Sequence, residues 1–424
     1  MERIDSTIAF GYLKALSFER RSGTPQEAKA ARMIADFLRG MKLWPRVEKF
    51  RVDTFSQGEG TLEVTAPFRK RYKAWPVGYS RPTPAGGIAG ELTYVENPAA
   101  DILGRMRGKV VLMEGGLRKK LYEALKGSGA KAVIRMSAPD RLVHGKYAYE
   151  IQRRLGRLPG VMISYEDGLE LVGRGARRVR IASRAPVTKT ISQNVIAEIP
   201  GDRYPREVMV VGAHYDSVMW SSGAADNAAG SALALALARR FAAAPLARTL
   251  RFIWFGCEEI GLEGSYRYVE KHRRRMKDVR FMLNLDVGGS TIGRVAARVT
   301  GTRKLANYVE VLGRELGAFS EATQGVASSD STPFARCGVQ ALNLSRRGGG
   351  ASYIHTRGDS LEHCGPAAFD LIGAAAAEFL SRVGNAVEFP FERALPKRIQ
   401  DELKKYITDN SGREYKYLGE TVDD

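Results

Sequence analysis

The sequence contains little cysteine. Three cysteines occur in 424 residues, Cys257, Cys337 and Cys364, and no two of them form a C-x-x-C pair. Even if two of them were bridged, one would be left over, so the spacing indicates neither a disulfide framework nor a thiolate zinc site. We therefore expect reduced thiols and a cytoplasmic location.

Long hydrophobic runs are also missing. No uninterrupted apolar stretch reaches the roughly 18 residues that a membrane-spanning helix needs. The chain opens on Met1-Glu-Arg-Ile-Asp5, which is charged and has no apolar core of the kind that a signal peptide carries. We therefore expect a protein that neither spans a membrane nor is exported.

Acidic residues are outnumbered by basic ones. The chain has 66 lysines and arginines against 47 aspartates and glutamates, which gives a net charge of +19 and a pI near 9.8. This balance fits nucleic-acid binding, an anionic surface or a basic soluble protein. The basic residues lie in short scattered clusters, and no zinc finger, helix-turn-helix or ribonucleoprotein signature accompanies them. We favour a basic soluble protein that has neither nucleic acid nor a membrane as a partner.

The first 188 residues predict an α-helical start and then a small β-rich module. Apolar residues at three- and four-residue steps indicate two helices within residues 5–42, the second beginning after Thr24-Pro25. A strand is expected at Val47–Phe55. Residues 58–188 show short Val and Ile runs separated by Gly and Pro, with one helix at 119–128. This stretch concentrates no His, Asp or Glu, which is typical of an accessory module.

From residue 189 onward strands and helices alternate, which is the signature of a largely parallel sheet with helices on both faces. The expected strands are 208–213, 250–255, 281–285 and 339–344, and the expected helices are 229–241, 265–272, 302–316 and 366–383. The predicted fold class is α/β, a three-layer α/β/α sandwich with a mostly parallel mixed sheet, plus a small β-rich inserted domain. The predicted parts are 1–57 and 189–388 for the main domain, 58–188 for the insertion and 389–424 for a C-terminal extension. The extension could be an arm for contacts in a homo-oligomer or a loosely held end.

Histidine and aspartate stand directly after the first strand of this alternating region. His214 and Asp216 follow the strand 208–213, which places them at the carboxyl edge of the sheet, where open α/β folds bind their ligands. Asp216 is a candidate catalytic residue, because it could accept the second imidazole N–H and fix which nitrogen of His214 faces a metal. The alternative is a structural histidine in a tight turn.

Two further aspartates occupy comparable positions. Asp226 lies just before the expected helix 229–241, where it could bridge two cations or simply cap the helix. Asp286 ends the strand 281–285 and precedes Gly288-Gly289. Burying a lone carboxylate is costly, so a cation is expected beside Asp286, although an aspartate that opens a glycine turn is the alternative.

Two neighbouring glutamates and a second histidine complete the set. Glu258 and Glu259 follow the strand 250–255, and adjacent residues point in different directions, so one could bind metal while the other serves as general base. A solvated acidic loop that opens a helix is the alternative. His355 would supply the second imidazole. The other three histidines have simpler explanations, a helix terminus for His272, a loop for His144 and a turn for His363.

The combined donor set of two imidazoles and several carboxylates, without thiolate, suits zinc, for which cobalt or manganese could substitute. Two such ions about 3.5 to 4 Å apart can share one bridging carboxylate and one bridging water. The sequence therefore predicts a two-metal hydrolase.

These residues resemble the two-zinc metallo-aminopeptidase family that includes the bacterial leucyl aminopeptidases and has glutamate carboxypeptidase as a relative. The stretch Cys257–Ser265 is similar to the E-E-x-G-L-x-G-S motif of that family, and Ser329-Asp330 with Pro333-Phe334 resembles its S-D-x-x-P-F segment. The resemblance implies the following roles: His214 and Glu259 as ligands of separate zinc ions, Asp286 and His355 as the ligands that complete the pair, Asp226 as the bridge, and Glu258 as the general base.

Other parts of the chain add to this resemblance or depart from it. Residues 58–188 look like a protease-associated domain inserted into the catalytic domain. In several members a tyrosine directly precedes the last histidine and helps to hold the oxyanion, whereas this chain has Ile354 there and Tyr353 one position earlier. Members often carry an acidic residue near the bridging aspartate, where this chain has Ala224 and Ala225. Asp330 and Tyr353 remain candidate substrate-binding residues.

The predicted function is that of a metal-dependent exopeptidase, an aminopeptidase that removes N-terminal residues from peptides by means of a zinc-bridged hydroxide and Glu258. A carboxypeptidase or dipeptidase of the same fold, a one-zinc glutaminyl cyclase and an inactive binding protein are the alternatives. The sequence leaves the side-chain preference, the physiological metal and the number of subunits open.

Overall fold

The structure is a computed structural model that describes residues 4–348 and 350–422. The charged first three residues and the last two residues of the extension therefore lie outside it. The chain forms two compact units. The first contains the residues up to Val52, Ile191–Tyr406 and the residues from Lys416 onward, and the second contains Asp53–Thr190 and Ile407–Tyr415.

An eight-stranded mixed sheet forms the centre of the first unit, with the strand order β1-β9-β11-β10-β12-β15-β13-β14. The strands are β1 (Arg46–Phe55), β9 (Val187–Ile199), β10 (Tyr204–His214), β11 (Arg248–Phe255), β12 (Val279–Leu285), β13 (Arg294–Thr300), β14 (Ala322–Gln324) and β15 (Gln340–Arg347). Strand β10 runs parallel to both β11 and β12, and β12 runs parallel to β15. Strands β9 and β13 pair antiparallel with β11 and β15. The carboxyl ends of β10, β11, β12 and β15 therefore meet at one edge.

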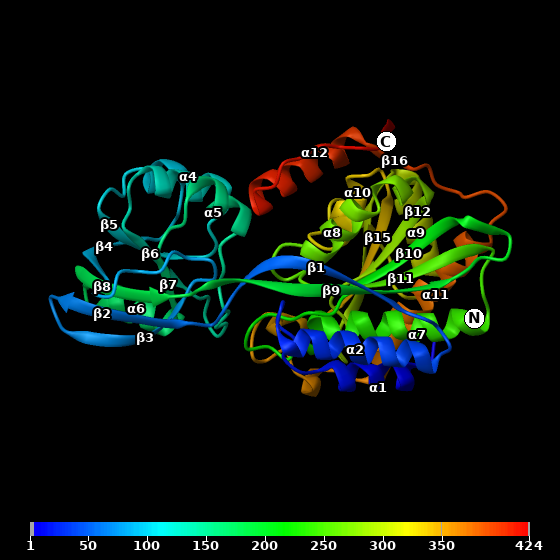
Figure 1. The fold of residues 1–424 in the computed structure, drawn as a ribbon, viewed down its shortest axis with the longest axis horizontal. Helices are drawn as coiled ribbons and strands as arrows, with labels where there is room; N and C mark the ends of the chain where they lie inside the picture. The colour runs from blue at the N-terminus through cyan, green and yellow to red at the C-terminus, as the bar shows by residue number, and fades with distance from the viewer. Residues whose placement is uncertain (1–3, 349, 423–424) are drawn as a thin grey trace. The chain divides into compact units, whose positions relative to one another are not determined.

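Helices pack against both faces of this sheet (Figure 1). Leu283 and Leu285 of β12 lie in the larger apolar cluster, whereas the intervening Met282 lies in the cluster on the opposite face. The larger cluster includes residues of α1 (Ser6–Leu16), α2 (Pro25–Gly40), α7 (Ala229–Ala243), α9 (Arg303–Glu315) and α11 (Asp370–Asn385). The opposite cluster includes residues of α8 (Glu263–Lys271) and α10 (Ser331–Ala335). Burial on both faces explains why the central strands read as continuous hydrophobic runs.

The strands and helices that were predicted for this unit agree with the structure, but other elements of the unit were not predicted. Helix α2 begins at Pro25, and the Thr24 side chain accepts a hydrogen bond from the Glu27 backbone N–H, as its sequence indicates. No prediction covered β13, β14 or α10. The short helices of the unit are η1 (Ala224–Ala228), η2 (Arg273–Asp278), η3 (Gly350–Tyr353), η4 (Leu361–His363) and η5 (Pro366–Phe369).

The second unit contains a closed barrel with the strand order β2-β3-β7-β6-β5-β4-β8. Its strands are β2 (Glu59–Ala66), β3 (Lys70–Pro76), β4 (Ile88–Val95), β5 (Lys109–Glu114), β6 (Ala132–Met136), β7 (Gly160–Ile163) and β8 (Arg178–Arg184). Its helices are α3 (Ala100–Leu103), α4 (Lys119–Gly127), α5 (Tyr149–Leu155) and α6 (Tyr165–Gly173).

The prediction of one helix within residues 58–188 is therefore wrong. Helix α6 carries a clear start signal, because the Ser164 side chain accepts a hydrogen bond from the Asp167 backbone N–H and two acidic residues occupy the first turn. The short Val/Ile runs masked this signal. Alternate residues of β5 point to two sides, with Leu112 in one apolar cluster and Val111 in another beside α4 and α5.

The C-terminal extension is packed, so its interpretation as a loosely held end is wrong for its first half. Strand β16 (Ala394–Pro396) pairs with β17 (Glu420–Val422), and α12 (Lys397–Lys405) buries Ile399 and Leu403 fully before η6 (Tyr406–Ser411). The Arg393 guanidinium donates to the backbone carbonyl of Val279 in β12. A role in a homo-oligomer stays a prediction.

Within the described ranges, no helix combines the length and the apolar composition that crossing a bilayer requires.

Candidate metal centre

Six predicted site residues form two groups at the carboxyl edge of the sheet. One group is His214, Glu258 and Asp286, and the other is Asp226, Glu259 and His355. Within each group the candidate ligand atoms all lie within 4.8 Å of one another. His214 is the last residue of β10, Asp286 follows β12, and the glutamates follow β11, so the parallel strands bring these side chains together.

Asp226 belongs to the second group and also contacts the first. Its Oδ1 is 3.2 Å from the Nε2 of His214, and its Oδ2 is 3.0 Å from the Nε2 of His355. The same His214 nitrogen is 3.3 Å from Oδ1 of Asp286, and the same His355 nitrogen is 3.4 Å from Oε2 of Glu259. Asp226 thus presents one oxygen to each imidazole, which is the arrangement that a bridging carboxylate needs.

Asp226 does not cap the following helix. Helix α7 begins at Ala229 and its N-cap residue is Ala228, while the backbone of Asp226 is non-helical with φ −122° and ψ 90°. The alternative interpretation of Asp226 as a helix cap is therefore wrong.

The centre gathers several carboxylates in a buried space, and this shifts the pKa values of its residues. Burial lowers the pKa of His214, but the charge of Glu258 and the hydrogen-bonded carboxylates of Asp216, Asp226 and Asp286 raise it well above its usual range. Burial raises the pKa of Glu258 far above its usual range, opposed by His214 and reinforced by neighbouring carboxylates. Divalent cations would neutralise this excess, so the residues present fit a metal centre of imidazole and carboxylate ligands.

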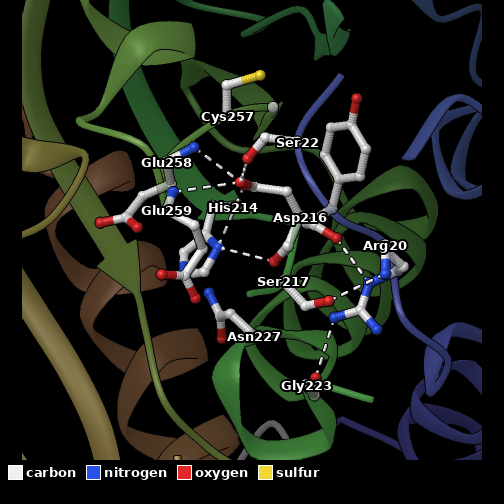
Figure 2. A network of polar contacts seen from close by, with 12 residues as sticks. Arg20, Ser22, His214, Asp216, Ser217, Gly223, Asn227, Cys257, Glu258 and Glu259 are labelled. Carbon is white, nitrogen blue, oxygen red and sulfur yellow. Dashed lines mark hydrogen bonds and ion pairs between the residues drawn. The ribbon is translucent and has the colours of Figure 1, made fainter. Parts of the chain in front are cut away.

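Asp216 faces His214 and also holds the glutamate loop. The Nδ1 of His214 is 3.2 Å from the Asp216 carbonyl oxygen and 3.5 Å from its Oδ1, so an N–H on this nitrogen leaves Nε2 free for a metal. The carboxylate accepts hydrogen bonds from the backbone N–H groups of Glu258 (3.0 Å) and Glu259 (3.2 Å) and from the Ser22 hydroxyl (2.6 Å). Figure 2 shows Asp216 between these groups. It therefore orients both the histidine and the glutamates.

Arg20 holds the loop that joins His214 to Asp226. Its guanidinium is fully buried and donates to the carbonyls of Tyr215 (2.7 Å) and Ser222 (2.5 Å) and to carbonyls of its own segment. It also donates to the carbonyl of Gly223 (3.0 Å), as Figure 2 shows. Burial lowers the pKa of Arg20 to about 10, although nearby carboxylates, of which Asp216 has the largest effect, oppose this decrease. The arginine therefore places a positive charge near the carboxylates of the centre.

Glu27 performs a similar task for the glutamate loop. Its Oε1 accepts hydrogen bonds from the Ser192 hydroxyl (2.9 Å) and the Cys257 backbone N–H (3.1 Å), and its Oε2 accepts one from the Gly23 backbone N–H (2.8 Å). Burial, reinforced by the charge of Asp216, raises the pKa of Glu27 to about 8. Glu27 thus fixes Cys257, the residue directly before Glu258.

Asp359 and Asn227 hold the Asp226 loop from the other side. The carboxylate of Asp359 accepts hydrogen bonds from the backbone N–H groups of Ala225 (2.7 Å) and Asp226 (3.1 Å). The Asn227 side chain donates to the carbonyl of Leu285 (2.8 Å) and accepts from the backbone N–H of Val287 (3.2 Å). Asn227 thereby links the loop of Asp226 to the end of β12, where Asp286 stands.

The backbone is constrained next to the candidate ligands. Cys257, Val287 and His355 all adopt positive φ angles, 59°, 66° and 66° respectively. This left-handed conformation is unfavourable for residues other than glycine and especially for β-branched valine. Side chains accept hydrogen bonds from the backbone N–H groups of Cys257 and Val287 and so help to hold two of these positions.

The two candidate substrate-binding residues lie outside both ligand groups. Asp330 is fully buried at the start of α10, and burial raises its pKa to about 7, opposed by His214. Tyr353 is 43% exposed, and its ring stacks on His363 with 4.9 Å between ring centroids. Their roles stay predictions. No role was predicted for Arg20, Glu27, Asn227 or Asp359, and only Asp359 offers a signal in the sequence, its place four residues after His355.

A mixed α/β fold with histidines and carboxylates gathered at the carboxyl ends of parallel strands is typical of metal-dependent hydrolases. Residues 194–380 match the sequence profile of peptidase family M28.

Relatives extend the likeness over most of the chain. Aminopeptidase YwaD of Bacillus subtilis (strain 168) is 29% identical over 414 residues, which cover 92% of this chain and 85% of that protein. The solved structure of BSAP, a zinc aminopeptidase from Bacillus subtilis, superposes with a TM-score of 0.73 at 27% identity and covers 92% of this chain and 98% of its own. Carboxypeptidase Q of Xenopus laevis is 25% identical over 264 residues, which cover 57% of this chain and 56% of that protein.

Proposed function

We propose that this protein is a zinc-dependent aminopeptidase that hydrolyses the first peptide bond of its substrates. The observation that carries the proposal is the pair of imidazole–carboxylate groups that Asp226 joins, each with ligand atoms within 4.8 Å of one another. The similarity to a zinc aminopeptidase over more than nine-tenths of both chains supports the choice of metal and of reaction.

Two zinc ions would be held by five side chains, one of which would contact both ions. His214 and Asp286 would bind one ion, Glu259 and His355 would bind the other, and Asp226 would contribute one oxygen to each. Bound zinc supplies a Lewis acid for the substrate carbonyl and lowers the pKa of a water molecule.

Glu258 would serve as the general base. It lies with His214 and Asp286 in one group, and its backbone is fixed by the hydrogen bond to Asp216. In this role the carboxylate takes a proton from the attacking water and returns it to the leaving amine. Asp216, Arg20 and Glu27 keep the base and the ligands in position.

The test combines metal analysis with a set of blocked and unblocked peptides. Protein loaded with zinc should contain two ions per chain and should release the first residue from peptides with a free amino terminus. Acetylation of that amino group should abolish turnover, and amidation of the carboxyl terminus should not. Removal of zinc by a chelator should abolish activity, and added zinc should restore it.

A carboxypeptidase or dipeptidase is the second candidate, favoured by the similarity to carboxypeptidase Q. Turnover of N-acetylated peptides with a free carboxyl terminus, and none of C-amidated peptides, would replace our proposal with this one. One zinc ion per chain together with cyclisation of N-terminal glutamine would instead indicate a glutaminyl cyclase.

Three further features belong to the same proposal. We infer a three-layer α/β/α arrangement for the first unit, from the helices on both faces of its sheet. The second unit would be a protease-associated domain that shapes the access of peptide substrates. The three free thiols support a cytoplasmic location.

A further inference from the structure

A groove of about 780 Å³ lies directly beside the candidate metal centre in the first unit. Asp286, a candidate ligand, forms part of its wall, so a substrate whose carbonyl reaches the metal centre has the groove next to it. Four arginines line the groove: Arg294, Arg298, Arg346 and Arg347.

The strand register shows how the groove extends across the sheet. Asn284 of β12 is paired with Asn343 of β15, which in turn is paired with Arg298 of β13. Side chains two residues apart on a strand share a face, so Asp286 lies on the same side as Asn284. Because neighbouring strands lie roughly 4.8 Å apart, the backbone of Arg298 is about 10 Å from that of Asn284. A substrate side chain and the Arg298 side chain that reach toward each other together span this distance.

The wall of the groove carries an excess of positive charge. Its acidic residues are Asp286, which a bound metal would neutralise, and Glu321. Among the described residues none of the four arginines forms an ion pair with a carboxylate. Arg298 donates to the carbonyl of Val326, and Arg346 donates to the carbonyls of Ser290 and Thr291. Guanidinium groups match carboxylates in geometry as well as charge.

A buried amide provides a second, independent sign of a ligand. Asn284 is fully buried and lines the groove, and its Nδ2 donates to the Ser329 hydroxyl at 2.8 Å. Its Oδ1 has no hydrogen-bond partner among the described residues. A buried acceptor without a partner is costly, so a ligand with an N–H group is expected beside it. A peptide supplies such a group, and a peptide with a carboxylate would satisfy the arginines as well.

We propose that this groove binds a carboxylate of the peptide substrate, so that the enzyme prefers anionic substrates. This inference rests on the proposed peptidase function. The carboxylate is either the side chain of glutamate or aspartate at the amino terminus or the free carboxyl group of a dipeptide. Both would be held by Arg298 and Arg294, whose side chains are exposed on the groove side of β13.

The experiment measures the kcat/KM of the zinc-loaded protein for two pairs of substrates and compares the two members of each pair. Glutamyl and glutaminyl p-nitroanilide differ only in the side-chain charge and have no carboxyl terminus. Leucyl-glycine and leucyl-glycinamide differ only in the terminal carboxylate. We expect a preference of about tenfold for the anionic member of one pair, and that pair identifies which carboxylate is bound. The preference should shrink as the salt concentration rises, because the arginines are exposed.

Variants separate the groove from the general positive charge of the protein. Arg298→Met and the double variant Arg294→Met/Arg298→Met should reduce the preference of the responding pair to about twofold or less. Arg206→Met removes an exposed arginine of β10 that does not line the groove, and it should leave the preference intact.

Each outcome decides the proposal. Turnover of leucyl p-nitroanilide and leucyl-glycinamide with no anionic preference in either pair would overturn the inference and leave the proposed function standing. An anionic preference that survives in the double variant, or that Arg206→Met removes equally, would also overturn it. No turnover of any substrate would refute the proposed function and, with it, this inference.

Discussion

Replacing Asp216 by asparagine tests whether the residues behind the metal centre control its chemistry. The substitution keeps the shape of the side chain and changes only the charge and one acceptor. In the structure Oδ1 of Asp216 accepts from the Glu258 backbone N–H, and Oδ2 accepts from the Glu259 backbone N–H and the Ser22 hydroxyl. An amide has one oxygen, so at least one of these donors would face an NH₂ group and lose its acceptor.

The size of the effect follows from these three hydrogen bonds. A hydrogen bond to a charged group contributes about 1.5–3 kcal/mol, and one to a neutral group contributes roughly half as much. Losing one bond and weakening two should lower the free energy of unfolding by about 3–6 kcal/mol. The glutamates and His214 would also be less well oriented, and loss of such support lowers metal affinity or activity by about 10- to 100-fold.

The assay compares wild type, Asp216→Asn and the control Asp202→Asn, which changes an exposed aspartate. Urea unfolding gives the stability, and titration with zinc and kcat/KM on an aminoacyl p-nitroanilide give the affinity and activity. If Asp216→Asn matched Asp202→Asn in zinc affinity and in kcat/KM, the argument that Asp216 orients the centre would be wrong.

Four further predictions concern single residues. Glu258→Gln should retain zinc and lose most activity, as metal analysis and kcat would show. Wild-type turnover by this variant would show that Glu258 is not the general base. Asp226→Asn should lower the zinc bound per chain after dialysis, and unchanged stoichiometry would contradict a bridging role. Arg20→Met leaves five carbonyl oxygens without their donor, so urea unfolding should show a loss of about 3–5 kcal/mol, and a loss below about 1 kcal/mol would contradict it. The folded-state pKa of Glu27, about 8, lies above its unfolded value, so its contribution to stability is present at low pH and lost as pH rises from about 4.5 to 8. Metal-free Glu27→Gln should therefore lack a decline on the order of 3 kcal/mol that wild type shows over this range, and parallel pH profiles would refute the assignment.

The fold was predictable where burial leaves a strong pattern. The central strand Tyr204–His214 is buried on both faces from Val208 onward, so its hydrophobic run is continuous and its end is easy to see. The strand Arg294–Thr300 lies near the edge of the sheet, and its exposed arginines alternate with buried residues. Such a short alternating segment next to a three-residue partner, β14, carries little signal in a single sequence.

The candidate ligands were predictable for a related reason. His214 and Asp286 end buried strands, and an ionisable residue at that position is unusual unless it binds something. Glu258 and Glu259 follow a third such strand. Parallel strands must bring their carboxyl ends to one edge, so the order of elements alone predicts that these residues meet.

The residues that position the ligands were not predictable in this way. Arg20 follows the first helix, and nothing in its local sequence indicates a buried guanidinium that donates only to backbone carbonyls. Glu27 looks like an ordinary acidic residue in the first turn of a helix. Their roles depend on contacts with residues roughly 170 to 230 positions away, which no periodicity encodes.

These distant contacts make the N-terminal helices part of the metal centre. Arg20 fixes the loop between His214 and Asp226, Ser22 bonds to Asp216, and Glu27 fixes the residue before Glu258. The segment between α1 and α2 and the first turn of α2 therefore contact both loops that carry the candidate ligands and base. The strained backbone of Cys257 lies at one of these contacts, where the Glu27 carboxylate accepts its N–H and so helps to hold the left-handed conformation. We therefore expect that substitutions which weaken these N-terminal contacts will also disturb the metal centre.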